Sequence, residues 1–219
     1  MRNTPEPWRL LLASNNGHKR EELARILEGY RILTPPEVGL VFEYEEAGQS
    51  FSQNALGKAF ALLGIASGRA EIDAVVADDS GLCVDALAGR PGVLSNRYGS
   101  EGGRLLDASE KNELLLRELE GVLDRRASFV CALAVALEPD RFFLVQEVLR
   151  GTIGRRPAGA GGFGYDPVFE MPGRGVTVAE LGGLEKDALS HRGRAARRIK
   201  ALLEDLEREE KAGLSEGTP

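Results

Sequence analysis

Cysteine, histidine and aromatic residues are scarce in this chain of 219 residues, which has two cysteines, two histidines and one tryptophan. Cys83 and Cys131 lie in apolar segments without CxxC spacing, so we expect buried free thiols in a reducing compartment. The longest unbroken apolar run, Phe129 to Leu137, has nine residues, whereas a membrane-spanning helix needs about 20. These absences argue against a disulfide-rich secreted protein and against a membrane-spanning one.

The chain also has no excess of positive charge. It contains 28 Lys and Arg against 34 Asp and Glu, a formal net charge of -6, which argues against a general nucleic-acid binder. Residues 1–8 lack the hydrophobic region of a signal peptide, so we expect a cytoplasmic protein with no membrane or nucleic-acid polymer as partner. With 42% hydrophobic residues, the chain can form one large domain or two small lobes; we expect 1–206 to fold as the domain and the charged, Gly/Ser-containing tail 207–219 to be disordered.

The most informative segment begins with the apolar run 75–77 and continues with Asp78, Asp79, Ser80 and Gly81. We interpret it as a buried strand that ends in a polar loop. Ligands of α/β proteins gather where strands meet their loops, so these side chains are site candidates. The alternative is a turn in which Asp and Ser bond only the local backbone.

The N-terminal segment predicts a strand at 9–13, a polar loop at 14–19 and then a helix. Such a junction directs backbone N–H groups and the positive end of the helix dipole into the loop, and Lys19 adds a full charge. A phosphate is the natural ligand, although the Walker spacing is absent. The alternative is that Asn15 or Asn16 simply caps the helix.

A second helix is expected from Ser50 to Ile65, with Asn54 and Lys58 four residues apart on one face. It follows an acidic segment that contains Glu45 and Glu46. An exposed acidic pair is more often solvated loop than a site, so the sequence leaves both interpretations open for these two residues.

Residues 158–169 are rich in glycine and contain Phe163 and Tyr165. Glycine lets backbone approach a ligand closely, and an aromatic ring among glycines can stack on a flat base. The alternative is that both rings pack back into the core. A terminal helix follows, capped by Ser190, with His191 and Arg192 in its first turn, where a cation opposes the helix dipole.

Strands alternate with helices in the first half, whereas 129–137 and 142–153 resemble an antiparallel hairpin. This combination predicts an α/β protein with a mixed sheet flanked by helices. The helix expected at 108–119 carries no chemistry that the pattern reveals.

Together these segments describe a nucleoside triphosphate site. Ser14, Asn16, Lys19 and Lys58 are suited to phosphates, and Glu45 with Asp79 to Mg²⁺. Phe163 is suited to stack on a base whose edge meets Lys186, His191 and Arg192.

The chain resembles the inosine triphosphate pyrophosphatase family, whose members are also called Ham1-like proteins, over nearly its whole length. Five motifs in order carry the resemblance: 13–19, 50–55 with 58–59, 77–92 with Ser95 and 97–98, 161–169 and 190–192. The resemblance implies an elongated mixed sheet with two lobes and a central substrate cleft. It also implies Mg²⁺-dependent hydrolysis of ITP, dITP and XTP to the monophosphate and pyrophosphate by a homodimer that cleanses the nucleotide pool.

The resemblance further implies roles for individual residues. Asp79 is the expected proton acceptor and, with Glu45, a metal ligand, although the residues alone do not decide between Asp78 and Asp79 as the base. The expected substrate contacts are Ser14, Asn15, Asn16, Gly17, His18, Lys19, Lys58, Ser80, Phe163, Gly164, Tyr165, Asp166, Lys186, His191 and Arg192.

The chain departs from the family pattern at Gln53, where an acid is usual, and at the glycine-rich segment 99–103. A Maf-like pyrophosphatase and a regulatory module that binds nucleotides without catalysis are the competing hypotheses. The segments 161–166 and 190–192 argue against the Maf-like enzyme.

Overall fold

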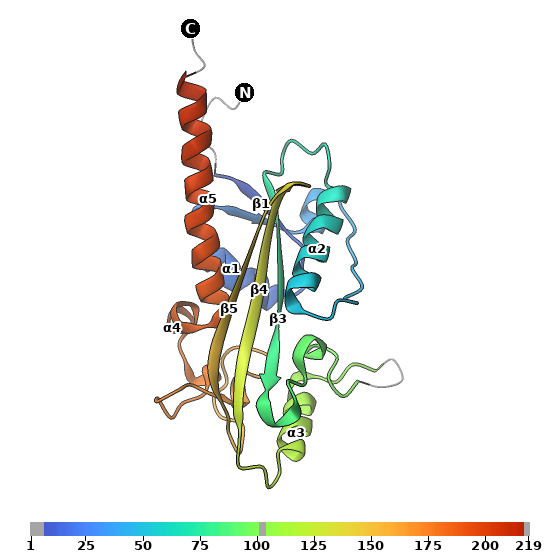
Figure 1. The fold of residues 1–219 in the computed structure, drawn as a ribbon, viewed down its shortest axis with the longest axis vertical. Coiled ribbons are helices and arrows are strands. Elements are labelled where there is room, and N and C mark those ends of the chain that lie inside the picture. The colour runs from blue at the N-terminus through green and yellow to red at the C-terminus, as the bar shows by residue number, and fades with distance from the viewer. Residues whose placement is uncertain (1–6, 101–103, 217–219) are drawn as a thin grey trace.

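The computed structural model describes residues 7–100 and 104–216. In these ranges the chain forms one sheet of six strands in the order β2-β1-β3-β4-β5-β6, with helices on both faces (Figure 1). The strands are β1 (Arg9–Leu12), β2 (Arg31–Leu33), β3 (Ala74–Val84), β4 (Arg126–Glu138), β5 (Arg141–Ile153) and β6 (Phe169–Glu170). The helices are α1 (Gly17–Ile26), α2 (Phe51–Ile65), α3 (Ala108–Glu118), α4 (Gly183–Leu189) and α5 (His191–Glu216).

The sheet is mixed, as the sequence predicts. β1 pairs in parallel with β2 and β3, and β3, β4, β5 and β6 then pair antiparallel. Parallel pairing requires the crossover that α1 provides, whereas the long β4–β5 pair needs only a tight hairpin at 139–140. The α/β architecture with helices on both sheet faces is therefore confirmed.

Two helix layers cover opposite faces of the long strands, α1 and α5 on one and α2 on the other (Figure 1). Strand residues alternate between these layers. Val76 packs with Leu23 of α1 and Ile199 of α5, whereas Val75 packs with Leu62 of α2. A third apolar cluster begins further along β3, at Leu82, so residues 78–81 lie between apolar clusters.

The expectation that β3 ends in a polar loop at 78–80 is wrong. β3 continues to Val84, and Asp78, Asp79 and Ser80 pair with Leu133, Ala132 and Cys131 of β4. The parallel partner β1 does end here, since its last pairing joins Leu12 to Val76. The polar residues thus begin where the parallel part of the sheet stops, and the long antiparallel partner keeps the backbone extended beneath them.

α5 continues to Glu216, through residues 207–216 of the tail, and its last turns project beyond the sheet (Figure 1). Projecting turns gain little tertiary packing, so the expected disorder of 207–219 stays a prediction. Among the described residues, no helix combines the length and apolar character that crossing a membrane requires.

Candidate active site

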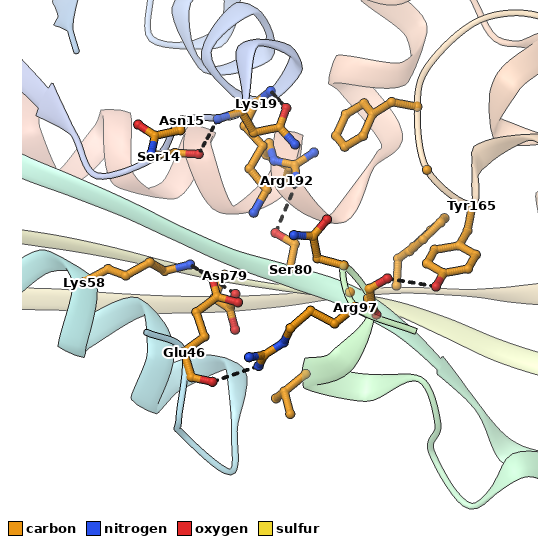
Figure 2. Close-up of a pocket in the computed structure, with 18 of the residues that line it drawn as sticks. Ser14, Asn15, Lys19, Glu46, Lys58, Asp79, Ser80, Arg97, Tyr165 and Arg192 are labelled. Carbon is orange, nitrogen blue, oxygen red and sulfur yellow. Dashed lines mark hydrogen bonds and ion pairs between the residues drawn. The ribbon is translucent and has the colours of Figure 1, made fainter. Parts of the chain in front are cut away.

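A pocket of about 690 Å³ opens beside the middle of β3 (Figure 2). Most residues that the sequence singles out line it, although they come from segments far apart in the chain. Those lining it are Ser14, Asn15, Asn16, Lys19, Glu45, Lys58, Asp79, Ser80, Phe163, Gly164, Tyr165, Asp166, Lys186, His191 and Arg192. Gly17 and His18 are not in the lining, but the His18 ring stacks on Phe163 with centroids 5.1 Å apart.

The N-terminal loop enters the pocket at the start of α1. Asn16 caps this helix, because its Oδ1 accepts hydrogen bonds from the backbone N–H groups of His18 and Lys19 at 3.0 and 3.2 Å. Asn16 also lines the pocket, so capping and a site position coexist in one residue. The helix therefore directs its positive end toward the pocket, as a phosphate site requires.

On the face of α1 and α5, Asp78 is fully buried and saturated with partners. Its oxygens meet Lys19 Nζ at 2.5 Å and Arg192 Nε at 2.9 Å, and Ser80 Oγ donates at 2.6 Å. The Cys131 thiol donates at 3.3 Å. Burial alone would raise the pKa of Asp78, but Arg192 and Lys19 outweigh it and hold the pKa well below its usual value. Asp78 is thus a fixed anion without a free lone pair toward the pocket.

Glu22 continues this network and was missed by the sequence reasoning. Its two oxygens lie 2.6 Å from Lys186 Nζ and 2.6 Å from Arg192 Nη1, and only 5% of the residue is exposed. Lys186 also donates to Asp166 at 2.7 Å. A carboxylate in the buried stripe of α1, next to Leu23, is the signal that could have revealed it.

On the opposite face, Asp79 points toward α2. Its Oδ1 accepts from Lys58 Nζ at 3.1 Å and its Oδ2 from Asn54 Nδ2 at 3.1 Å. Lys58 also contacts Glu46 at 2.7 Å. Burial raises the pKa of Asp79, with Glu46 adding to the effect, while Lys58 opposes both. A buried carboxylate with a raised pKa that faces the pocket is a better proton acceptor than Asp78.

The acidic loop brings two carboxylates to the pocket instead of the single one expected. Glu45 lies exposed at the rim, whereas Glu46 is half-buried and pairs with Lys58. Arg97 Nη2 donates to the Glu46 carbonyl at 2.8 Å and so ties the loop to the far wall of the pocket (Figure 2). Sequence reasoning assigned no role to Glu46 or Arg97.

The donor set fits a hard divalent cation. Among the described residues no group of three potential ligands is clustered, but Mg²⁺ commonly takes only one or two carboxylates and keeps waters and substrate phosphates as its other ligands. Asp79 and the Glu45–Glu46 pair supply carboxylate oxygens on one side of the pocket. Lys58 already lies between Glu46 and Asp79, which indicates that this position attracts positive charge.

At the other end of the pocket the Phe163 ring lies close to two cations. Lys186 Nζ is 4.7 Å and the Arg192 guanidinium 5.4 Å from its centroid. His191 is buried, and its ring stacks on Phe129 with centroids 4.9 Å apart. Burial, helped by neighbouring Arg192, holds the pKa of His191 well below its usual value, so the imidazole is neutral.

Tyr165 and the two departures from the family pattern complete the comparison with the sequence predictions. Tyr165 contributes to the lining, but its hydroxyl donates to the Ser95 carbonyl at 2.9 Å and the residue is buried, so its position is also structural. Gln53 Oε1 accepts from Gln49 N at 2.8 Å near the start of α2, a bond that an acid would also accept. Of the segment 99–103, residues 101–103 lie outside the described ranges.

The far wall contains residues to which the sequence reasoning gave no chemistry. Ala108 and Lys111 of α3 line the pocket, together with Leu105 just before it. No periodic or motif signal marks them, because they reach the site only through the packing of α3 near Gly164, whose carbonyl accepts from Asn112 at 3.0 Å.

Comparisons with known proteins agree with one another. The sequence profile of the Ham1 family matches residues 10–202. The chain is 44% identical over 187 residues to a dITP/XTP pyrophosphatase of Treponema denticola, covering 85% of this chain and 94% of that protein. It is 45% identical over 208 residues to a dITP/XTP pyrophosphatase of Nocardia farcinica, covering 90% and 96%.

Solved structures give the same result. The Ham1 protein of Staphylococcus aureus matches with a TM-score of 0.78 and 34% identity, over 90% of this chain and 98% of that one. A nucleoside-triphosphatase / dITP/XTP pyrophosphatase of Mycobacterium abscessus matches with a TM-score of 0.69 and 43% identity, over 87% and 98%.

Proposed function

Because the chain belongs to the Ham1 family, we propose that it is a pyrophosphatase of non-standard purine nucleoside triphosphates. Its substrates are ITP, dITP and XTP, and its products are the nucleoside monophosphate and pyrophosphate. Relatives named dITP/XTP pyrophosphatase cover nearly the whole chain and support this activity. The observation that carries the proposal is that phosphate-type cations, carboxylates and the Phe163 ring face one pocket.

Release of pyrophosphate means that water attacks the α-phosphorus and that the bond from this atom to the α–β bridging oxygen breaks. Asp79 takes the proton from the attacking water. Its raised pKa suits this role, and general-base catalysis contributes about 10²- to 10⁴-fold to such reactions. Asp78 has no such capacity, because its oxygens are held by Lys19, Arg192 and Ser80.

The triphosphate lies between the start of α1 and Lys58 in this proposal. Ser14 and the N–H groups at the α1 terminus bind phosphate oxygens, and Lys19 and Lys58 stabilise the charge that develops on the leaving pyrophosphate. Asp79, with Glu45 or Glu46, would hold Mg²⁺, which supplies charge neutralisation and polarises the water when bound.

The base stacks on Phe163, and its edge meets Lys186 of α4 and Arg192 of α5. Lys186 and Arg192 are hydrogen-bond donors, and hypoxanthine and xanthine carry a carbonyl acceptor at position 6 where adenine carries an amine. An amine that faces donors in a buried site is left without a partner, and such mismatches discriminate strongly. This arrangement accounts for selection of ITP, dITP and XTP over ATP.

We also propose that the protein acts in the cytoplasm as a homodimer, that Mg²⁺ is its cofactor, and that residues 1–206 form one domain whose two lobes border the pocket. The family supports these statements in general terms. They extend to a role in removing deaminated purines from the nucleotide pool.

The test is a pyrophosphate-release assay with ITP, dITP, XTP, ATP, dATP and dGTP, with and without Mg²⁺. We expect Mg²⁺-dependent turnover of the first three. Equal rates for dITP and dATP would contradict the specificity, and binding of nucleotides without turnover would indicate a regulatory module instead. A preference for modified pyrimidine nucleotides would favour a Maf-like enzyme.

A further inference from the structure

Asn54 of α2 lies between the Asp79 carboxylate and the acidic loop, residues 43–48. Its side chain is fully buried. Nδ2 donates to Asp79 Oδ2 at 3.1 Å, and Oδ1 accepts the backbone N–H of Gly48 at 2.8 Å. A side-chain amide has a donor and an acceptor side by side, so this one residue satisfies a carboxylate on β3 and a backbone donor in the loop.

A second link joins the same two segments one helical turn later. Lys58 donates to Glu46 Oε1 at 2.7 Å, to Asp79 Oδ1 at 3.1 Å and to the Asp78 carbonyl at 2.8 Å. Residues four apart lie on one face of a helix, so α2 presents Asn54 and Lys58 together toward β3. The separation of the loop acids from Asp79 is therefore fixed by α2 at two points.

The first of these links depends on glycine at position 48. A Cβ atom there would lie 2.4 Å from Asn54 Oδ1, and the nearest other atom, Cβ of Gln53, would be 3.0 Å away. Neither contact is possible without a shift, since Asn54 is fully buried and cannot turn away. The close approach of the loop to Asn54 therefore requires glycine at position 48.

We propose that Asn54 is a positioning residue for the hydrolysis reaction: it orients the Asp79 carboxylate and holds the acidic loop at the distance from it that catalysis requires. The inference rests on the proposed function, because it concerns the residue that takes the proton from water. Asn54 itself contacts no reacting atom.

Asparagine is the residue that can make both bonds. Aspartate at position 54 keeps the acceptor for Gly48 N–H but places a second carboxyl group against Asp79. Aspartate offers no amide donor to Asp79 Oδ2, so the bond that orients the Asp79 carboxylate is lost. Alanine loses both bonds. Asn54→Asp therefore separates the effect on Asp79 from the effect on the loop.

The experiment measures kcat and KM for dITP with saturating Mg²⁺, together with hydrogen exchange of the residue 48 amide by ¹⁵N NMR. For Asn54→Asp we expect kcat to fall about 10- to 100-fold, as for other residues that orient a catalytic group, with KM near the wild-type value and slow exchange at Gly48 retained. Asn54→Ala should lower kcat at least as much and also accelerate exchange at Gly48.

Two further variants complete the design. Gly48→Ala displaces the loop but leaves the Asn54–Asp79 bond, so kcat should fall while the chain stays folded by circular dichroism. Ser52→Ala is the matched control, because Ser52 is on the same helix and its hydroxyl donates to Gln146 at 3.0 Å on an exposed surface. Its kcat and amide exchange should equal those of the wild type.

Wild-type kcat in Asn54→Asp would overturn the inference, and so would a loss of activity that only follows loss of folded protein. If the wild type releases no pyrophosphate from any triphosphate, the proposed function fails, and the catalytic part of this inference fails with it. The claim that Asn54 holds the acidic loop is then still tested by hydrogen exchange at Gly48. An unchanged exchange rate in Asn54→Ala would disprove it.

Discussion

Asp78 and Asp79 are neighbours on β3, yet they belong to two regions with different chemistry. Because strand residues alternate between faces, Asp78 points toward α1 and α5 and Asp79 toward α2. On the α5 side, Asp78 and Glu22 each meet two cations. Burial raises the pKa of both carboxylates, but Arg192 together with Lys19 or Lys186 outweighs burial and lowers it. On the α2 side, Asp79 and Glu46 share the single ammonium of Lys58.

The difference shows how one dipeptide can supply both a fixed framework and a carboxylate suited to accept a proton. A carboxylate with two cationic partners stays ionised and holds its neighbours in place, so it organises the base end of the pocket. Asp79 shares the Lys58 cation with Glu46, and burial raises its pKa, as suits a general base. Two carboxylates that share one cation also leave room for a further positive charge, as a metal site needs. Four measurements test this division.

The largest effect is expected for Asp79→Asn. Asparagine still accepts a bond from Lys58 but takes no proton at neutral pH, so kcat should fall about 10²- to 10⁴-fold while the melting temperature changes little. Steady-state pyrophosphate release at saturating Mg²⁺ measures it. Activity within a few-fold of the wild type would show that Asp79 is not the general base and that the two carboxylates do not have these different roles.

Asp78→Asn should act mainly on stability. It leaves Lys19 and Arg192 buried against a neutral group, and breaking one side of a buried ion network costs about 3–5 kcal/mol in the free energy of unfolding. Urea denaturation measures it. Asp124→Asn, which removes an exposed partner of Arg126, is the control and should leave stability unchanged. A stable Asp78→Asn protein would contradict the framework role.

Phe163→Ala should weaken substrate binding without removing the chemistry. Stacking on an aromatic ring contributes about 1–3 kcal/mol per base, so KM for dITP should rise about 5- to 150-fold, with a smaller change in kcat. Phe163→Trp retains a stacking surface and should restore most of the affinity. If kcat falls and KM does not change, Phe163 acts in the chemical step, as proposed for Asp79, and not in substrate binding.

The smallest effect concerns pH and His191 on the α5 side. The pKa of His191 is well below 6.5 in the folded chain. When the pH falls below 6.5, His191 therefore binds a proton in the unfolded state but not in the folded state. The stability that this group contributes is present above pH 6.5 and is lost below it, by about 1.4 kcal/mol per pH unit. Urea denaturation between pH 7.5 and 5.5 measures the slope, which should become flatter in His191→Gln. An unchanged slope would show that His191 is protonated in the folded protein.

Much of the fold could be predicted from the sequence. The period of the apolar residues and the caps Asn16, Ser50 and Ser190 are local signals, and the structure has helices at all three. The extent of β3 could not be predicted, because a DDSG segment resembles a turn unless the thirteen-residue strand β4 is known to pair alongside it. A long-range partner overrode the local turn preference.

The candidate site was predictable in outline and not in its pairings. Most segments that face the pocket stand out by residue type alone, although the α3 residues Ala108 and Lys111 do not. Glu22 and Glu46 did not, since nothing near them in sequence reveals that Lys186, Arg192 or Lys58 will be their partners. These ion pairs join residues from 12 to 170 positions apart.

The sequence by itself determined which groups are available: a cationic loop at a helix start, adjacent carboxylates after an apolar run, an aromatic ring among glycines and a capped terminal helix. Only the tertiary structure decided which of the two carboxylates is fixed by two cations and which has a raised pKa. The physical reason is that a carboxylate's pKa depends on the cations that packing places around it. The packing of α5 against one sheet face and α2 against the other gives Asp78 two cations and leaves Asp79 sharing one.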